Sequence, residues 1–401
     1  MFQFIENGTV TSTPGFEAAG IFCGIKKKKK DLALIYSHTL CNAAGTFTLN
    51  KVKAAPLLIS QEAINNKSQI KAVLINSGNA NACTGDNGLK DAKFSQYYCA
   101  SSLGINPSEV LVSSTGVIGQ NLPMSKLLNG IDEIVPNLSS TGGPDAAEAI
   151  LTTDKKTKSF AVKVELENGE VTIGGICKGS GMIMPNMATM LAFITTDANI
   201  EQPLIQQMLS SSVNISFNKI SVDGDTSTND MVILMANGIS KINIEENSKN
   251  RTLFQEALDA VCIEMAKSII SDGEGATKLV EINVTGAHSK KDADLVGKAV
   301  ANSPLVKTAL NGEDANWGRI MSAAGNSGAD LDPAKMTISF DNLPVVLPGY
   351  NIVINEEAAK GILSKQEIQI NINLNGGAES TTWWTCDFSE EYIRINADYR
   401  T

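Results

Sequence analysis

Histidine, paired cysteines and long apolar runs are the features that this sequence lacks. Two of its 401 residues are histidines, His38 and His288. Its seven cysteines form no Cys-x-x-Cys pair and their number is odd, so neither a disulfide framework nor a zinc site is indicated, and no metal site is predicted. With two histidines, the sequence offers few candidates for a nucleophile system in which histidine is the base. If the protein is an enzyme with a covalent intermediate, we expect a base other than histidine.

Positive charge is also scarce. The 33 Lys and Arg residues face 43 Asp and Glu residues, which gives a net charge of −10 and a pI near 4.9. This charge repels phosphate backbones and argues against nucleic acid as a partner. No stretch of about 18 apolar residues occurs, and residues 1–8 lack the basic and apolar regions of a signal peptide, so we expect a cytoplasmic protein with no membrane partner. The run Lys26–Lys30 is interpreted as a solvated loop.

Strands and helices are expected to mix along the whole chain. The length predicts two to three domains or a single large α/β domain with a satellite, and an apolar fraction of 43% is enough for a large core. Short aliphatic runs predict buried strands at 31–36 and 71–76, and helical spacing follows at 88–100 and 125–134. Beyond about residue 280 the pattern turns strand-rich, with strands expected at 305–310, 336–340 and 368–374. The sequence therefore predicts an α/β or α+β fold with a smaller strand-rich C-terminal lobe.

Two loops of small polar residues follow predicted strands. Asn76–Gly85 can offer backbone N–H groups to an anion, but it fits neither the Rossmann nor the P-loop spacing. Ser113–Gly119 follows the strand expected at 110–112. There the Thr115 hydroxyl and the Gly116 N–H can point together at a developing oxyanion, because glycine permits close backbone approach. A structural turn is the alternative for both loops.

Two further loops carry acidic residues. Ser221–Asp230 has carboxylates at alternate positions, as a hard-cation loop does, but it lacks the Glu that an EF-hand has at its twelfth position. A hydrogen-bonded turn leading into a strand at 231–235 is the simpler interpretation. Glu274 stands between two glycines in Asp272–Lys278. It belongs either to a solvated turn or, if it faces a pocket, to a site for a substrate ammonium.

The segment 174–194 contains glycines, methionines and the pair Ala188-Thr189. Its apolar pattern favours a Gly-rich turn followed by a buried, methionine-rich segment. A catalytic interpretation is also open. Attack of the Thr189 hydroxyl on the Ala188 carbonyl would free an α-amine, whose ordinary pKa of about 7.7–8.0 suits the general base that a threonine nucleophile needs. Lys178 would hold a substrate carboxylate or depress the pKa of the new amine.

At this segment the sequence resembles the glutamate N-acetyltransferase / ornithine acetyltransferase family of arginine biosynthesis, N-terminal-nucleophile enzymes that cut themselves into two chains. The resemblance covers nearly the whole chain in order, and its block Lys178–Leu191 is highly specific. Two departures, Leu49 where a second Thr is expected and Ala315 where Pro is usual, touch no catalytic role. The matching blocks are 15–21, 50–56, 76–85, 114–119, 151–154, 178–191, 221–230, 312–319 and 396–401.

The resemblance implies a set of site residues. Cleavage between Ala188 and Thr189 would give an α chain of residues 1–188 and a β chain of residues 189–401, in which 189–280 completes the main core and 281–401 forms the C-terminal lobe. Thr189 would be the nucleophile, and Thr115 and Gly116 match the family's oxyanion-hole pair. The positions that match its substrate-binding set are Thr152, chosen over Thr153 by register, Lys178, Thr189, Glu274, Asn396 and Thr401.

The resemblance also implies a reaction, partners and a fold. The acetyl group of N2-acetylornithine would pass through acetyl-Thr189 to glutamate, giving ornithine and N-acetylglutamate without a cofactor, and the motifs leave acetyl-CoA open as a further donor. The fold would be the layered α+β sandwich of the ornithine acetyltransferase and aminopeptidase-like N-terminal-nucleophile type, with two α and two β chains in a heterotetramer. A self-processing aminopeptidase or amidase is the alternative enzyme, and an anion-binding scaffold is the non-enzymatic alternative.

Overall fold

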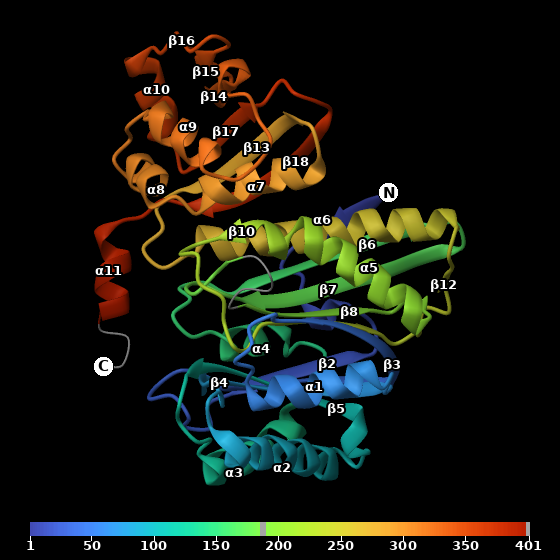
Figure 1. Ribbon diagram of the computed structural model, residues 1–401. Coiled ribbons are helices and arrows are strands. Elements are labelled where there is room, and N and C mark those ends of the chain that lie inside the picture. Colours follow the sequence, from blue (N-terminus) through green and yellow to red (C-terminus); the bar gives the residue numbers. More distant parts are fainter. Residues whose placement is uncertain (185–189, 398–401) are drawn as a thin grey trace. The chain divides into compact units, whose positions relative to one another are not determined.

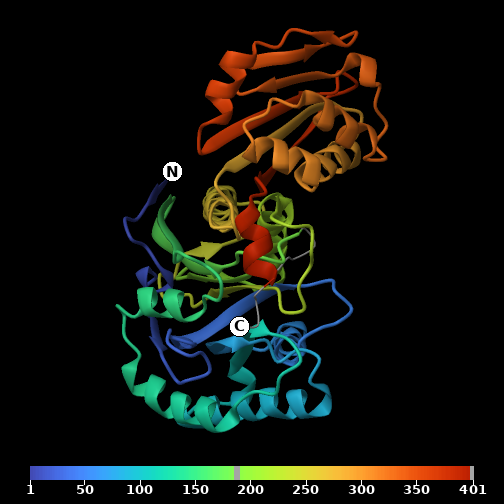
Figure 2. The same cartoon turned by 90° about the vertical axis from the view of Figure 1, so that its left-hand side faces the viewer.

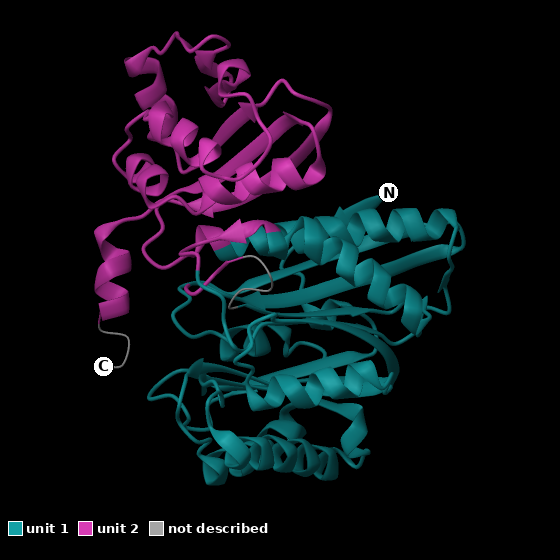
Figure 3. Ribbon diagram, viewed as in Figure 1, with its two compact units in different colours: residues 1–180, 186–218, 225–269 teal, residues 181–185, 219–224, 270–401 magenta. Residues whose placement is uncertain are grey.

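The computed structural model describes residues 1–184 and 190–397 of the chain. The chain divides into two compact units (Figure 3). Unit 1 comprises residues 1–180, 186–218 and 225–269, and unit 2 comprises residues 181–185, 219–224 and 270–401. Because two short segments of unit 2 interrupt unit 1 in the sequence, no single cut of the chain separates the units.

Unit 1 is built on a nine-stranded sheet (Figure 1). The strand order is β1-β6-β7-β8-β11-β3-β4-β5, and β2 pairs with β3 beside this path. Neighbouring strands are antiparallel except for the parallel pairs β8–β11 and β4–β5. The strands are β1 (Phe2–Phe4), β2 (Phe16–Ile21), β3 (Leu32–Phe47), β4 (Ile70–Asn79), β5 (Val110–Val117), β6 (Lys158–Leu166), β7 (Gly169–Lys178), β8 (Leu191–Thr196) and β11 (Met231–Ala236).

The segments 32–35 of β3 and 72–75 of β4 are buried on both faces, which explains their aliphatic sequences. Successive side chains of a strand point to opposite faces, so Val73 and Ile75 enter one apolar core while Ala72 and Leu74 enter another. Helices α2 and α3 contribute to the second core and lie together at one side of the sheet (Figure 2). The helices of unit 1 are α1 (Ala55–Asn65), α2 (Gly85–Leu103), α3 (Met124–Ile134), α4 (Gly143–Ala149), α5 (Gln202–Ile215) and α6 (Lys249–Ser271), and β9 (Asn199–Ile200) pairs with β12 (Asn243–Ile244).

Unit 2 has a seven-stranded sheet of order β10-β18-β13-β17-β14-β15-β16. Along β13 the buried residues Val280, Ile282 and Val284 alternate with half-buried polar ones, so its apolar core lies on one face of the strand. The strands are β10 (Ile220–Ser221), β13 (Leu279–Ala287), β14 (Thr337–Phe340), β15 (Leu343–Leu347), β16 (Asn351–Ile352), β17 (Glu367–Asn373) and β18 (Glu379–Cys386). The helices are α7 (Lys290–Ala301), α8 (Pro304–Asn311), α9 (Trp317–Gly325), α10 (Glu356–Leu363) and α11 (Glu390–Ala397).

The mixed α/β class predicted from the sequence is confirmed, and so are most of the predicted elements. The strand expected at 305–310 is wrong, because this segment forms the helix α8. The Ser303 side chain caps it by accepting a hydrogen bond from the Val306 N–H, and Pro304 occupies the first turn, where a helix tolerates proline. Among the described residues, no helix is both long and apolar enough to cross a membrane.

Candidate active site

Thr115 and Gly116 lie at the carboxyl end of β5, beside the end of β4. The loop expected at 113–119 is in fact largely strand, since β5 continues to Val117 and pairs Thr115 with Ser77 and Gly116 with Gly78. Gly116 has a φ of 134°, and a Cβ there would lie 2.3 Å from the carbonyl carbon of Gly78. This close backbone approach requires glycine.

Two polar side chains fix this end of β5. The Asn229 side-chain amide donates to the carbonyl oxygens of Ala80 and Ser114 over 2.7 and 2.8 Å. The Ser114 hydroxyl donates to the side-chain oxygen of Asn76 over 2.6 Å. The strand residue directly before Thr115 is therefore held through its carbonyl and through its side chain.

The start of β8 is held by Asp230, which directly precedes β11. Its Oδ1 accepts the Met190 N–H over 3.0 Å, and Met190 is the first described residue after the gap. Burial raises the pKa of Asp230 well above its ordinary value, although the Met190 N–H, Lys178 and nearby hydroxyls lower it in part. The second carboxylate oxygen, Oδ2, is buried without a hydrogen-bond partner among the residues that the structure describes.

Lys178, the last residue of β7, faces a buried carboxylate. Its ammonium donates to the Thr152 hydroxyl over 2.7 Å and lies 3.6 Å from Asp154. Asp154 also accepts from the Lys158 ammonium over 2.7 Å. The backbone N–H groups of Thr152 and Gly179 donate to it over 3.0 and 2.8 Å. Burial alone would raise the pKa of Asp154, but Lys178 and Lys158 outweigh burial and hold the pKa below its ordinary value.

The lysine run Lys26–Lys30 is only partly solvated, so its interpretation as a solvated loop is wrong at both ends. Residues 27–29 are exposed, whereas Lys26 and Lys30 are half-buried. Lys30 forms ion pairs with Asp145 and Glu148 at 2.5 and 3.0 Å. The Lys26 ammonium donates to the carbonyl oxygen of Leu151, the residue before Thr152, over 2.9 Å.

Unit 2 brings Glu274 and Asn396 together. The Asn396 side-chain amide, on α11, donates to Glu274 Oε2 over 2.9 Å. Glu274 is 5% exposed, so its alternative placement in a solvated turn is wrong. Its carboxylate packs on the backbone of Gly181, where an added Cβ would lie 2.3 Å from Oε2. A buried carboxylate with an amide donor can hold an ammonium group.

The first carboxylate of the acidic loop 221–230 is used in backbone hydrogen bonds. The Asp223 carboxylate accepts the backbone N–H groups of Met182 and Ile183 over 2.6 and 2.8 Å. Within residues 1–184 and 190–397, no group of three or more His, Cys, Asp or Glu residues is arranged to hold a metal ion. The loop leads into β11, as the simpler interpretation predicted.

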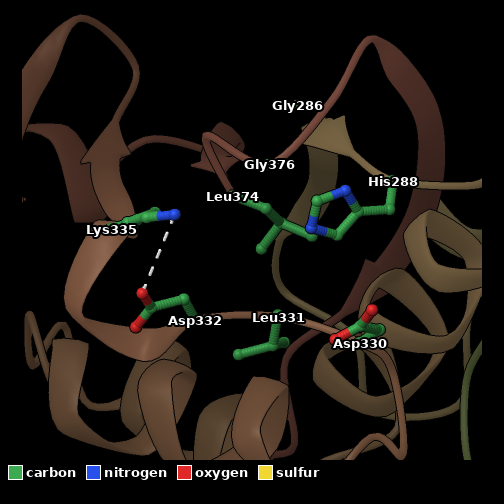
Figure 4. A pocket seen from close by; sticks show the side chains of 8 residues that line it. All are labelled: Gly286, His288, Asp330, Leu331, Asp332, Lys335, Leu374 and Gly376. Carbon is green, nitrogen blue, oxygen red and sulfur yellow. Dashed lines mark ion pairs between the residues drawn. The ribbon is translucent and has the colours of Figure 1, made fainter.

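Two pockets of the described structure are lined by none of the predicted site residues. In unit 2, His288, Asp330 and Lys335 help to line a pocket in which the Lys335 ammonium lies 3.9 Å from Asp332 (Figure 4). Its volume of about 20 Å³ accommodates a water molecule but no amino-acid substrate. A groove of about 510 Å³ in unit 1 is lined from β1, β6 and α6, and no predicted site residue lines it.

Some of the predicted site residues lie within the described part of the chain, and others lie outside it. In unit 1 the structure pairs Thr152 with Lys178 and places Thr115 and Gly116 on β5, and in unit 2 it pairs Glu274 with Asn396. Ala188, Thr189 and Thr401 lie outside the described residues.

Sequence reasoning did not assign a role to Asp154, Asn229, Asp230 or Lys26. The first three stand inside the family-like blocks 151–154 and 221–230, and that membership was the available signal. Nothing in the pattern separated Lys26 from the four lysines after it.

Sequence comparisons with known proteins cover nearly the whole chain. The profile of the ArgJ family matches residues 17–401. "Arginine biosynthesis bifunctional protein ArgJ" of Oceanobacillus iheyensis is 48% identical over 400 residues, which cover 100% of this chain and 98% of that protein. The crystal structure of the Bacillus halodurans protein of the same name is 44% identical, with a TM-score of 0.45, and covers 47% of this chain and 98% of its own. Ornithine acetyltransferase of Mycobacterium tuberculosis, crystallised with ornithine, is 38% identical, with a TM-score of 0.43, and covers 46% and 98%.

Proposed function

The chain belongs to the ArgJ family and is an acyltransferase of arginine biosynthesis, and from this premise we propose that it transfers the acetyl group of N2-acetylornithine to glutamate through an acetyl intermediate on Thr189. The products are ornithine and N-acetylglutamate. The nucleophile becomes available when the chain is cut between Ala188 and Thr189, which frees the Thr189 α-amine.

One observation carries the proposal: two neighbouring side chains connect the start of β8 with the end of β5. Asp230 accepts the Met190 N–H, and Asn229 donates to the Ser114 carbonyl. Met190 directly follows Thr189 in the sequence, and Ser114 directly precedes the oxyanion pair. These contacts support a site in which the nucleophile and the oxyanion donors act on one carbonyl group.

The proposed chemistry has two half-reactions. The Thr189 hydroxyl attacks the acetyl carbonyl and gives its proton to the Thr189 α-amine, while the Thr115 hydroxyl and the Gly116 N–H donate to the oxyanion. The C–N bond breaks, the proton passes to the leaving amine, and ornithine departs. The glutamate amine then attacks the acetyl ester in the same manner and restores the free hydroxyl.

The charged groups of the two substrates suggest which residues bind them. Lys178 takes the α-carboxylate that both substrates carry. Asn396 and Thr401 belong to the substrate-binding set that the resemblance implies. The buried Glu274 takes the δ-ammonium of ornithine. We also propose acetyl-CoA as a second acetyl donor and a heterotetramer of two α and two β chains. The relatives' name "bifunctional" is consistent with a second activity.

Intact-mass measurement and trapping of the intermediate test this function. We expect active protein to consist of two fragments, one ending at Ala188 and one beginning at Thr189, and incubation with N2-acetylornithine to add one acetyl group to the second fragment. Thr189→Ala is expected to stay uncut and inactive. An acetyl adduct on another residue, or full activity of an uncut chain, contradicts the proposal.

Glutamate dependence separates the transferase from the alternative hydrolase. A transferase protects its acyl intermediate from water until the acceptor binds. We therefore expect multiple-turnover release of ornithine to require glutamate, whereas a hydrolase would release ornithine at the same rate without it. A parallel assay with acetyl-CoA and glutamate measures the second donor activity.

A further inference from the structure

We propose that Lys26 binds the side-chain carboxylate of the acceptor glutamate. The inference rests on the proposed function and adds a residue to which no role was assigned above. Glutamate carries two carboxylates, whereas N2-acetylornithine carries one carboxylate and one ammonium. A site that uses Lys178 for the common α-carboxylate needs a second cation for glutamate alone.

The backbone of Lys26 is fixed beside the strands of the site. Asp31, at the start of β3, is fully buried. Its two carboxylate oxygens accept the backbone N–H groups of Cys23 and Lys26 over 2.6 and 2.7 Å. This closed turn sets the direction in which the Lys26 side chain leaves the backbone.

The Lys26 side chain runs from the oxyanion strands toward Thr152. Its stem packs on Gly78, where an added Cβ would lie 2.7 Å from Lys26 Cγ, and Gly78 is the register partner of Gly116. Its ammonium reaches the carbonyl oxygen of Leu151, next to Thr152. Lys26 therefore reaches from the end of β5 that carries Gly116 to the loop that carries Thr152.

The lysines near Asp154 and Asp31 provide positive charge for a further carboxylate. Lys158 and Lys178 lie 2.7 and 3.6 Å from the Asp154 carboxylate, and the carboxylate that acts most strongly on Lys26 is Asp31. Asp154 and Lys178 both act electrostatically on Lys26. An ammonium has three N–H donors, and Leu151 O is the described hydrogen-bond acceptor of Lys26.

The protonation state of Lys26 suits this role at neutral pH. Burial lowers its pKa to about 8, and the neighbouring cations Lys29 and Lys178 act in the same direction, while Asp31 opposes them. The group is therefore mostly charged at pH 7 and loses its charge over the next two pH units. The lysines at 27–29, in contrast, are exposed.

Equilibrium binding of glutarate and of its monoamide tests the proposal independently of turnover. We expect Lys26→Met in the processed enzyme to weaken glutarate binding by about 10-fold or more while changing monoamide binding less than about 2-fold. Lys26→Arg is expected to retain the preference for glutarate, and the exposed control Lys28→Met is expected to bind both ligands as the wild type does. An unchanged ratio of the two affinities in Lys26→Met overturns the proposal.

A second measurement distinguishes binding from a structural role. In single-turnover assays, ornithine release from N2-acetylornithine should change less than about 3-fold in Lys26→Met, because the donor lacks the second carboxylate. Equal losses in both half-reactions would assign Lys26 to the support of the Thr152 loop instead. Glutarate binding should also weaken as the pH rises through 8 in the wild type but not in Lys26→Arg. A wild type that binds glutarate but transfers no acetyl group would contradict the proposed function and leave the Lys26 assignment standing.

Discussion

The Lys158 ammonium lies 2.7 Å from the Asp154 carboxylate, and neither side chain is exposed to solvent. Such a pair costs desolvation energy that its mutual attraction offsets only when further hydrogen bonds satisfy the groups. Asp154 has these bonds, because it also accepts the N–H groups of Thr152 and Gly179. The pair therefore positions Lys178 and Thr152, which contact Asp154.

Removal of the Lys158 charge should destabilise the protein and weaken substrate binding. Lys158→Met leaves Asp154 with Lys178 as its remaining cation, so Lys178 is drawn toward that carboxylate and away from the substrate. We expect a loss of about 3–5 kcal/mol in stability and a raised KM for N2-acetylornithine with a smaller change in kcat. Thermal unfolding and initial rates measure both effects.

The matched control for this variant is Lys163→Met. Lys163 lies on the same strand, β6, but its ion pair with Glu170 is half-exposed on both sides. Its replacement should change stability by less than about 1 kcal/mol and leave KM unchanged. Similar effects of the two substitutions on stability and KM would contradict the role proposed for the buried pair of Lys158 and Asp154.

Gly116→Ala should abolish most of the activity. Its Cβ would lie 2.3 Å from Gly78 C and 2.5 Å from Asn79 N, so β5 must move away from β4 and displace the oxyanion donors. Because loss of one oxyanion donor costs about 100- to 1,000-fold in kcat, we expect a decrease of that size with little change in KM.

Gly119→Ala is the control for backbone strain alone. Gly119 also has a positive φ, 81°, but nothing lies within 4 Å of an added Cβ. This variant should lose about 1 kcal/mol of stability and keep its kcat within a few-fold. If Gly119→Ala loses as much activity as Gly116→Ala, strain in the segment rather than the clash at Gly116 explains the effect. The rates of self-cleavage, followed by mass, should be measured for both variants.

The sequence predicted those elements whose hydropathy pattern is set by neighbouring residues, and it failed where distant residues determine the structure. The run 71–76 predicted a buried strand because its aliphatic residues fill both faces of β4, and this was confirmed. The polar residues after it were expected to form loops, yet Ser77 and Asn79 belong to β4. Their polar groups are satisfied by distant partners, such as the carbonyl of Ala149 that accepts the Ser77 hydroxyl, and no local pattern reports such partners.

The candidate site shows the same limit. Thr115, Gly116 and Lys178 were candidates from their local chemistry, which the family resemblance strengthened, whereas Thr152 came from the resemblance alone. Lys26 was missed because five consecutive lysines look alike in sequence. Only the fold places Lys26 on Gly78 and leaves its neighbours in solvent.

Glu274→Gln should affect the donor more than the acceptor. The substitution keeps an oxygen for the Asn396 amide, which donates over 2.9 Å in the wild type, but removes the negative charge. We expect KM for N2-acetylornithine to rise by about 10-fold or more, since a buried charge partner of the ammonium is lost, and KM for glutamate to change little. Steady-state kinetics with each substrate varied measure this split, and Glu313→Gln, at a partly exposed ion pair with Lys278, provides a control. Equal increases in both KM values would contradict the assignment of Glu274 to the ammonium.

Asp230→Asn should make the protein relatively more stable as the pH rises. In the unfolded chain an aspartate ionises near pH 3.9, whereas burial raises the pKa of Asp230 well above that value in the folded protein. Between these two pKa values the folded state binds more protons than the unfolded state, so this residue lowers the stability of the wild type as the pH increases. Asparagine keeps an oxygen for the Met190 N–H and cannot ionise. We therefore expect a melting-temperature difference, variant minus wild type, that is smallest near pH 4 and becomes more positive toward pH 8.

The comparison is best made in the uncut Thr189→Ala background, so that differences in chain cleavage do not contribute to the melting temperatures. Asp132→Asn, at an exposed carboxylate on α3, is the control for removal of a carboxylate outside the core. A pH-independent difference for Asp230→Asn would mean that Asp230 ionises in the folded protein as it does in the unfolded chain. A difference that becomes more negative with pH would mean that the ionised carboxylate is stabilised, most simply by Lys178, and that burial is the weaker influence on its pKa.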